Sequence, residues 1–297
     1  MKSTRPSECE FAPHTLYVRY RTVSIVTYAT LRFGSCIQTH RSGSLSAVSI
    51  SVGEIKRPPL YLAVLEILRA SFEGFGLLMS SPLLATGPRG DGHGVMVLPG
   101  FATDDNSTTL LRLFLTGLGY DAHPWGLGIN LDHRTAGYDG EHVSRQLGRI
   151  VDTTGQKVSL VGWSLGGVIA REAARRHPES VRQVISIASP FCGNPHANHV
   201  GSVYTLLSGN RVDSSEARRR FALGPKPLPV PSTAIYSRSD GVTAWENCLG
   251  NTDHQSENIE VHASHFGIVM NATVFQIIAD RLAQGEGAWT PYTPPGI

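Results

Sequence analysis

The 297 residues are enough for one large α/β domain or two smaller ones, and their composition, 41% hydrophobic and 17% charged, is typical of a globular protein. The net charge of +2 hides an asymmetry, because residues 1–57 hold 8 Lys/Arg and 3 Asp/Glu whereas the remainder holds 18 and 21. Since the main body is nearly neutral, it lacks the clustered basic face that nucleic-acid binding requires, and we expect no nucleic-acid partner.

The apolar stretches are too short to cross a membrane. None approaches the roughly 20 uninterrupted apolar residues of a membrane-spanning helix. The best candidate for a signal peptide, residues 15–31, is interrupted by Arg19 and Arg21. We therefore expect no transmembrane segment and a soluble protein that is cytoplasmic by default, with export left undecided.

The chain has four cysteines: Cys9, Cys36, Cys192 and Cys248. They show neither a C-x-x-C motif nor metal-ligand spacing, so the sequence predicts no bound metal and no cofactor. A disulfide between Cys192 and Cys248 is an alternative, because both residues lie in loops that follow neighbouring predicted strands. His196 and His199 would need a third ligand to hold a metal, and the spacing supplies none.

Residues 1–57 are rich in Ser, Thr and Arg, with a weak alternation around residues 16–26 that indicates a strand or nothing. Their charge and composition differ from those of the rest. We expect an N-terminal extension that is either disordered or not part of the natural polypeptide, and no catalytic residue within it.

From residue 58 onward the patterns become clear. Five apolar residues recur at helical spacing and predict one apolar helix face that packs on the domain or lies near the site entrance: Tyr61, Val64, Leu65, Leu68 and Phe72. Residues 95–98 then form an apolar run that ends in Pro99-Gly100-Phe101. This run predicts a buried strand followed by a glycine turn.

Strand and helix patterns alternate through the rest of the chain. Helices are expected at residues 106–118, 139–152, 164–177 and 274–282, and strands at 120–125, 157–161, 181–188, 232–237 and 258–263. This alternation predicts a mostly parallel central sheet with helices on both faces. In such a sheet the ligand site lies beyond the carboxyl ends of the strands.

The sequence Gly162-Trp163-Ser164-Leu165-Gly166 stands between a predicted strand and a predicted helix. In that context a G-x-S-x-G motif forms a sharp turn that displays the serine hydroxyl above the end of a sheet. Ser164 is therefore the candidate nucleophile.

Two further residues meet the strand-end criterion. Asp240 follows the predicted strand that ends at Tyr236, and His265 follows the one that ends near His262. The order Ser, Asp, His along the chain is the one found with a nucleophile elbow. We select Asp240 over Asp213, which lies in a polar helical stretch, and over Asp253, which lies too far beyond its strand. His262 is assigned to the strand itself.

From about Gly94 to Ala283 the chain resembles the α/β-hydrolase superfamily, nearest to its bacterial lipases and esterases. The resemblance rests on the elbow at residues 162–167, on an acid segment at 236–241 and on a histidine segment at 264–267. It implies an α/β-hydrolase fold, a Ser164-His265-Asp240 triad and hydrolysis of carboxylic esters.

Each of these residues has a separate task in such a site. His265 would take the proton of Ser164, and Asp240 would orient and stabilise the imidazole. The oxyanion needs two preorganised donors, expected from the backbone N–H groups of Leu165 and Phe101. The loop at Phe101 departs from the H-G-G-G form that many members of the superfamily have.

We expect residues 58–297 to form a single domain with a short cap at about 190–231, made of a helix at 200–221 and a proline-rich return. So short a cap predicts an open cleft for simple esters, including water-insoluble ones. We interpret Arg218, Arg219 and Arg220 as a solvated helix face, with a substrate anchor as the alternative. Four aromatic residues are candidates for an acyl pocket or for the core: Trp125, Trp163, Phe191 and Trp245.

The expected substrate is a small-molecule or lipid ester. The same triad also catalyses thioester hydrolysis, lactone opening and acyl transfer, and the fold does not select among these reactions. A catalytically silent hydrolase-like binding protein is the alternative from another class. The sequence leaves the oligomeric state open.

Overall fold

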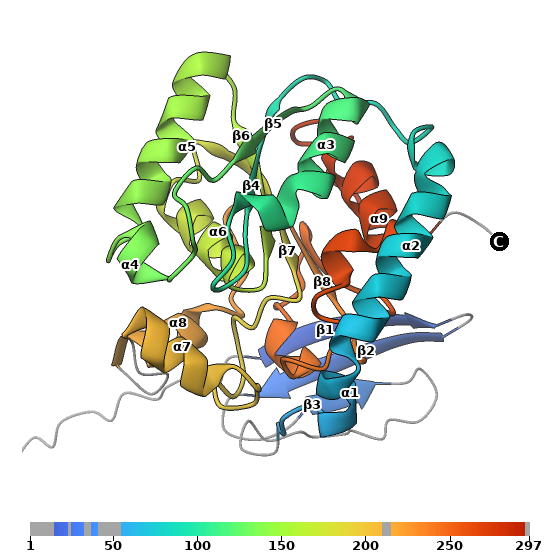
Figure 1. The fold of residues 1–297 in the computed structure, drawn as a ribbon, viewed down its shortest axis with the longest axis vertical. Coiled ribbons are helices and arrows are strands. Elements are labelled where there is room, and N and C mark those ends of the chain that lie inside the picture. Colours follow the sequence, from blue (N-terminus) through green and yellow to red (C-terminus); the bar gives the residue numbers. More distant parts are fainter. Residues whose placement is uncertain (1–14, 23–24, 33–36, 41–54, 210–214, 295–297) are drawn as a thin grey trace, which may run out of the picture.

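The structure is a computed structural model that describes residues 15–22, 25–32, 37–40, 55–209 and 215–294 (Figure 1). Its centre is a six-stranded sheet in which every strand pair is parallel. The strand order is β5-β4-β6-β7-β8-β9. The strands are β4 Gly94–Leu98, β5 Asp121–Pro124, β6 Val158–Trp163, β7 Val181–Ile187, β8 Ser232–Tyr236 and β9 Ser256–Glu260.

Helices cover both faces of this sheet, as predicted (Figure 1). The helices are α1 Leu60–Val64, α2 Glu66–Leu84, α3 Thr109–Leu118, α4 His133–Ala136, α5 Glu141–Thr154, α6 Leu165–Arg176, α7 Gly201–Ser208, α8 Ser215–Leu223 and α9 Ala272–Leu282. Short 3₁₀ helices occur at η2 Asp105–Thr108, η3 Trp245–Cys248 and η4 Ile268–Met270.

The sheet separates two hydrophobic cores, and successive residues of a strand enter opposite ones. Val95 and Val97 of β4 pack with α2, α3 and α9, whereas Met96 and Leu98 pack with α5 and α6. Because both faces are covered, every residue of the central strands β4 and β6 is buried, and these strands do not alternate between buried and exposed residues. This is why the strands at β4 and β6 were recognisable as continuous apolar runs.

The N-terminal region contributes a second, antiparallel sheet of three strands, β1 Thr15–Thr22, β2 Ile25–Arg32 and β3 Ile37–His40. The weak alternation at residues 16–26 thus coincides with strands. Residues 1–14 and 41–54 lie outside the described residues, as do Cys9 and Cys36. That residues 1–57 are an N-terminal extension, either disordered or not part of the natural polypeptide, stays a prediction.

The predicted apolar helix face after residue 58 is turned the other way. The pattern lies on α1 and α2, but the side chains of its five residues, from Tyr61 to Phe72, are exposed, with relative exposures of 41% to 72%. The buried residues of α2 are Glu66, Ala70, Leu77 and Leu84. Polar side chains decide which side of α2 faces the protein, because Glu66 accepts hydrogen bonds from backbone amides of the loops beyond β8 and β9. Helical periodicity alone could not show this.

Two predicted boundaries were also wrong. The strand expected at residues 258–263 is β9 Ser256–Glu260, so the exposed His262 lies in the following loop. The single helix expected at residues 200–221 is two helices, α7 and α8, and residues 210–214 between them lie outside the described part.

Candidate active site

The candidate nucleophile lies on a strained turn. Ser164 follows β6 directly and precedes α6, with φ 51° and ψ −121°. A non-glycine residue with positive φ costs free energy and is held there by its surroundings. A side chain at Gly162 would collide with the backbone of Gly166, and one at Gly166 would collide with the carbonyl groups of Leu98 and Pro99. The glycines therefore allow the strand, the turn and the neighbouring loop to pack closely around Ser164.

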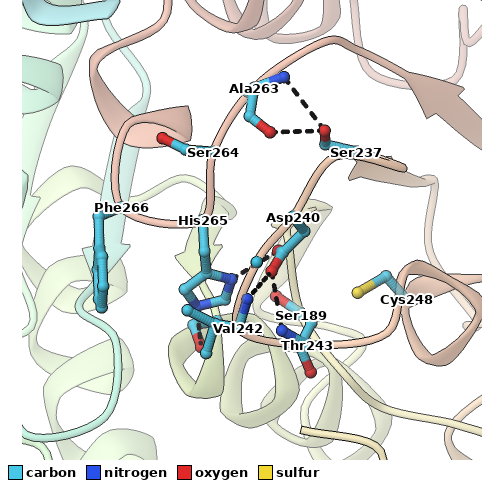
Figure 2. A network of polar contacts seen from close by, with 12 residues as sticks. Ser189, Ser237, Asp240, Val242, Thr243, Cys248, Ala263, Ser264, His265 and Phe266 are labelled. Atoms are coloured by element: carbon cyan, nitrogen blue, oxygen red, sulfur yellow. Dashed lines mark hydrogen bonds and ion pairs between the residues drawn. The ribbon is translucent and has the colours of Figure 1, made fainter. Parts of the chain in front are cut away.

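The structure brings the three candidate catalytic residues together. His265 Nε2 lies 3.1 Å from Ser164 Oγ, and His265 Nδ1 lies 2.6 Å from Asp240 Oδ2. Asp240 Oδ1 accepts hydrogen bonds from the N–H groups of Val242 and Thr243, both at 2.8 Å, so this carboxylate has partners on both oxygens (Figure 2). Because β6, β8 and β9 are parallel, their carboxyl ends deliver these three residues to one edge of the sheet.

The loops of Asp240 and His265 are also joined to each other. Ser237 Oγ donates to the carbonyl oxygen of Ala263 at 2.6 Å and accepts from its N–H at 3.1 Å (Figure 2). Trp163 Nε1 donates to the carbonyl oxygen of His265 at 3.1 Å. These contacts fix the backbone on which the Asp240-His265 pair depends.

His265 is buried, with 3% of its surface exposed. Burial by itself lowers the pKa of His265, but the charge and hydrogen bond of Asp240 and the charge of Glu66 outweigh it. The net effect is a pKa of His265 above its ordinary value of 6.5. This is the environment that an imidazole needs to accept a proton and hold it as an imidazolium.

The two proposed oxyanion donors border the same cleft as Ser164. Leu165 occupies the first position of α6, where helix geometry leaves the N–H without an intrahelical acceptor. Phe101 follows β4 in the neighbouring loop, and its ring lies 5.2 Å from that of Tyr204. The positive end of the α6 dipole points to the same place.

Asn130 holds the Phe101 loop, and no sequence motif indicated this role. Its buried amide donates to the carbonyl oxygen of Pro99 at 2.8 Å, and its backbone carbonyl accepts from the N–H of Ala102 at 2.8 Å. These contacts lie on both sides of Phe101. Only the fold brings Asn130 to a loop about 30 residues away in sequence.

The cleft beside Ser164 has a volume of about 900 Å³ when the space open to solvent is included. Its lining is largely apolar and includes Phe101, Val168, Phe191 and Phe221. Val200, Tyr204 and Phe221 come from the segment around α7 and α8, which borders one side of the cleft. Of the four aromatic candidates for an acyl pocket, Phe191 lines the cleft. The other three do not: Trp125, Trp163 and Trp245.

The expectation of a solvated arginine run was wrong for Arg220. Arg218 and Arg219 are exposed, but Arg220 lines the cleft and its guanidinium pairs with two carboxylates. The Nε atom lies 2.6 Å from Glu172 Oε1, and an Nη atom lies 3.0 Å from Asp132 Oδ2. Sequence periodicity could not reveal this pairing, because both partners lie on distant elements.

A second Ser-His-Asp contact occurs at the opposite edge of the sheet. His93 Nε2 lies 2.8 Å from Ser159 Oγ, and His93 Nδ1 contacts Asp91. Burial is the main cause that lowers the pKa of His93. Ser159 has 0% exposure, so its hydroxyl cannot meet a substrate.

The other acidic and histidine residues considered from the sequence take no part in the Ser164-His265-Asp240 contacts. Asp253 accepts from the N–H of Gln255 in a local turn, and Asp213 is outside the described residues. His199 Nε2 contacts the carbonyl oxygen of Pro58 at 2.9 Å. In the described part of the chain, no group of three or more His, Cys, Asp or Glu could hold a metal ion. Nor is any helix there both long and apolar enough to cross a membrane.

The alternative of a Cys192-Cys248 disulfide is not realised. Both residues are buried free thiols. Cys192 Sγ lies 3.2 Å from the carbonyl oxygens of Glu246 and Leu249, and burial raises the pKa of this thiol to about 12. The two thiols contact different carbonyl oxygens, since Cys248 Sγ lies 4.0 Å from that of Ala244.

Comparison with known proteins gives partial matches. A 117-residue segment is 45% identical to the biotin biosynthesis bifunctional protein BioHC of Teredinibacter turnerae, covering 39% of this chain and 20% of that protein. Another segment, of 87 residues, is 28% identical to the pimeloyl-[acyl-carrier protein] methyl ester esterase of Citrobacter koseri. It covers 29% of this chain and 34% of that esterase. The matches thus span a fifth to a third of these relatives' length.

The solved structure of Aspergillus fumigatus lipase B covers 68% of this chain and 55% of the lipase, with a TM-score of 0.53 and 20% identity. At this identity the likeness concerns the fold. A family model for the α/β hydrolase fold matches residues 98–222, which include Phe101, Ser164 and Leu165 and end before Asp240 and His265. With its parallel sheet and its serine elbow, the chain has the α/β-hydrolase fold.

Proposed function

We propose that the protein is a serine hydrolase that cleaves carboxylic esters through an acyl-enzyme. The observation that carries this proposal is the chain of contacts from Asp240 through His265 to Ser164, next to a largely apolar cleft. The relatives named as methyl ester esterases and the lipase of similar fold support the same reaction class.

In the first half of the reaction, Ser164 Oγ attacks the ester carbonyl carbon while His265 Nε2 takes the hydroxyl proton. Asp240 holds the imidazole in the tautomer that has Nδ1 protonated, and its charge stabilises the imidazolium. The backbone N–H groups of Leu165 and Phe101 donate to the oxyanion. His265 then gives the proton to the leaving alkoxide, and the acyl group remains on Ser164.

In the second half, a water molecule takes the place of the alcohol. His265 removes a proton from this water, whose oxygen attacks the acyl carbonyl carbon. The tetrahedral intermediate collapses, the carboxylic acid leaves, and the proton returns from His265 to Ser164 Oγ. No metal or other cofactor is needed for any of these steps.

The lining of the cleft favours an apolar acyl group. Phe101, Val168 and Phe191 offer hydrocarbon surface next to Ser164, and α7 and α8 border the cleft as a short cap. We therefore propose small-molecule or lipid esters as substrates. A panel of esters from acetate to palmitate, with a methyl ester, a lactone and a thioester, would define the preference and separate esterase activity from thioesterase or lactonase activity.

The decisive variant is Ser164→Ala. It should abolish hydrolysis of a p-nitrophenyl short-chain ester and labelling by a fluorophosphonate, while circular dichroism shows an unchanged fold. Ser159→Ala is the matched control, because it removes the serine of the buried Ser159-His93 contact and should leave labelling intact. Full activity in Ser164→Ala would refute the proposal, and absence of both activity and labelling in the native chain would favour a silent binding protein.

A further inference from the structure

Helix α2 carries a buried carboxylate that faces the catalytic loops. Glu66, in the first turn of α2, has 1% exposure. Its Oε1 atom accepts hydrogen bonds from the N–H groups of Gly241 at 2.8 Å and His265 at 3.0 Å. Its Oε2 atom accepts from the N–H of Phe266 at 3.0 Å. One side chain thus receives three backbone donors, an arrangement that a carboxylate satisfies and a neutral side chain does not.

The three donors belong to two different loops. Gly241 follows Asp240 in the chain, whereas His265 and Phe266 lie in the loop beyond β9. Glu66 therefore fastens the backbone on both sides of the Asp240-His265 contact. Without this acceptor, three N–H groups at the proposed catalytic pair would be buried without a partner, which is unfavourable and would let the two loops shift.

Neighbouring residues of α2 hold the same loops. Arg69 Nη1 donates to the carbonyl oxygen of Ser239 at 2.6 Å and lies 3.8 Å from Glu66 Oε1. Glu73 Oε1 accepts from the N–H of Ser264 at 2.7 Å. Positions 66, 69 and 73 are spaced so that they share one face of a helix. This polar face explains why the predicted apolar face, Tyr61 to Phe72, points outward.

Several charged or titratable groups surround the His265 loop. Asp240 contacts the ring from the loop after β8, and Glu66 approaches its backbone from α2. Arg69 lies beside Glu66, and Glu73 binds the preceding amide. His262 lies 3.5 Å from Ser239 Oγ, and the buried thiol of Cys248 lies near Asp240. Of the two carboxylates on α2, only Glu66 adds to the charge that favours the imidazolium.

We propose that Glu66 is a positioning residue for the catalytic pair: it sets the relative placement of the Asp240 and His265 loops and adds negative charge beside His265. It touches neither the substrate nor Ser164, so it acts through His265. The activity readout rests on the proposed ester hydrolysis, but the charge effect can be measured without it.

The test compares Glu66→Gln, Glu66→Asp and Glu73→Gln in the full chain. Glu66→Gln keeps the shape of the side chain but removes its charge. It also replaces one acceptor oxygen by an amide N–H₂, which cannot accept the backbone N–H that faces it. It should lower kcat/KM on the order of 10- to 100-fold. It should also move the acid limb of the pH profile to lower pH. Glu66→Asp keeps the charge with a shorter reach, so it should lose kcat and retain the acid limb. Glu73→Gln should leave the acid limb unchanged.

A second readout does not depend on hydrolysis. The His265 imidazole, assigned by comparison with His265→Gln, is titrated by NMR in histidine-labelled protein. The pH midpoint of the His265 titration should be lower in Glu66→Gln than in the native protein and unchanged in Glu73→Gln. An unchanged midpoint together with unchanged kcat/KM in Glu66→Gln would overturn the positioning role even in an active enzyme. If Glu66→Gln does not fold, native kcat in Glu66→Asp would overturn it instead. An inactive, unlabelled native chain would refute the ester hydrolase proposal alone, because the titration still reports on Glu66.

Discussion

At the residue scale, the environment of His265 defines how the site should respond to pH. The ring is buried, yet Asp240 and Glu66 favour its protonated form, so the pKa of His265 is above 6.5. A general base must be neutral in the free enzyme to take the serine proton. Activity should therefore be lost on the acidic side as the imidazole becomes charged.

We predict that kcat/KM rises with pH through a midpoint above 6.5. Asp240→Asn removes the neighbouring charge and the acceptor of Nδ1–H, so it should lower kcat by up to about 10,000-fold and lower the pKa of His265. Stopped or continuous assays with a p-nitrophenyl ester between pH 5 and 9 measure both effects. A midpoint at or below 6.5 in the native protein would contradict the charge environment described for His265.

At the element scale, the junction of β6 and α6 depends on the absence of side chains. Gly166 faces the carbonyl groups of Leu98 and Pro99, and Gly167 faces Ser189 and Gly162. This contact places the loop after β4 against the first turn of α6. The proposed donors at Phe101 and Leu165 depend on the same contact.

Gly166→Ala should destabilise the protein by about 1–3 kcal/mol, because the added methyl group has no room and forces the backbone apart. It should also reduce activity, since the Phe101 loop shifts. Gly148→Ala on α5 is the control: a methyl group there meets no atom within 4 Å, and the change should stabilise the helix by about 0.8 kcal/mol. Urea unfolding of both variants measures the difference, and equal stabilities would disprove the close contact.

At the scale of the whole molecule, one buried charge network joins elements that border the cleft. Arg220 of α8 pairs with Asp132, next to α4, and with Glu172 of α6. Tyr204 of α7 also donates to Asp132. Asp132 has 0% exposure. Burial is the main cause that raises the pKa of Glu172, and the charge of Arg220 opposes this rise. Helices α7 and α8 are thus attached to α6 and to the segment before α4 through carboxylates.

Arg220→Met should destabilise the protein by about 3–5 kcal/mol, because it leaves two carboxylates without their cation. Burial raises the pKa of Glu172 and Arg220 opposes this effect, so in the variant the pKa of Glu172 would lie further above that of the unfolded chain. The folded form would then bind more protons, and the deficit would shrink as pH falls. Unfolding in urea at pH 7.5 and 5.5 tests this. A deficit that is small, or equal at both pH values, would show that the network does not hold the cap.

The sequence alone determined the layered α/β architecture and the three residues that meet at the site. Apolar runs such as β4 are visible because both faces of the sheet are buried, and the chain order of parallel strands places their carboxyl ends at one edge. Ser164, Asp240 and His265 could be selected because each follows a predicted strand. These signals are local, spanning a few residues each.

Only the tertiary structure decided which residues support that site. Glu66 lies 199 residues from His265 in sequence, and Arg220 lies 88 residues from Asp132. No local periodicity encodes such pairs, so the polar face of α2 was mistaken for its outer side, and Arg220 for a solvated residue. A side chain's direction is set by the partners that the completed fold brings to it, and for Glu66 those partners are the backbone amides of the two loops that carry Asp240 and His265.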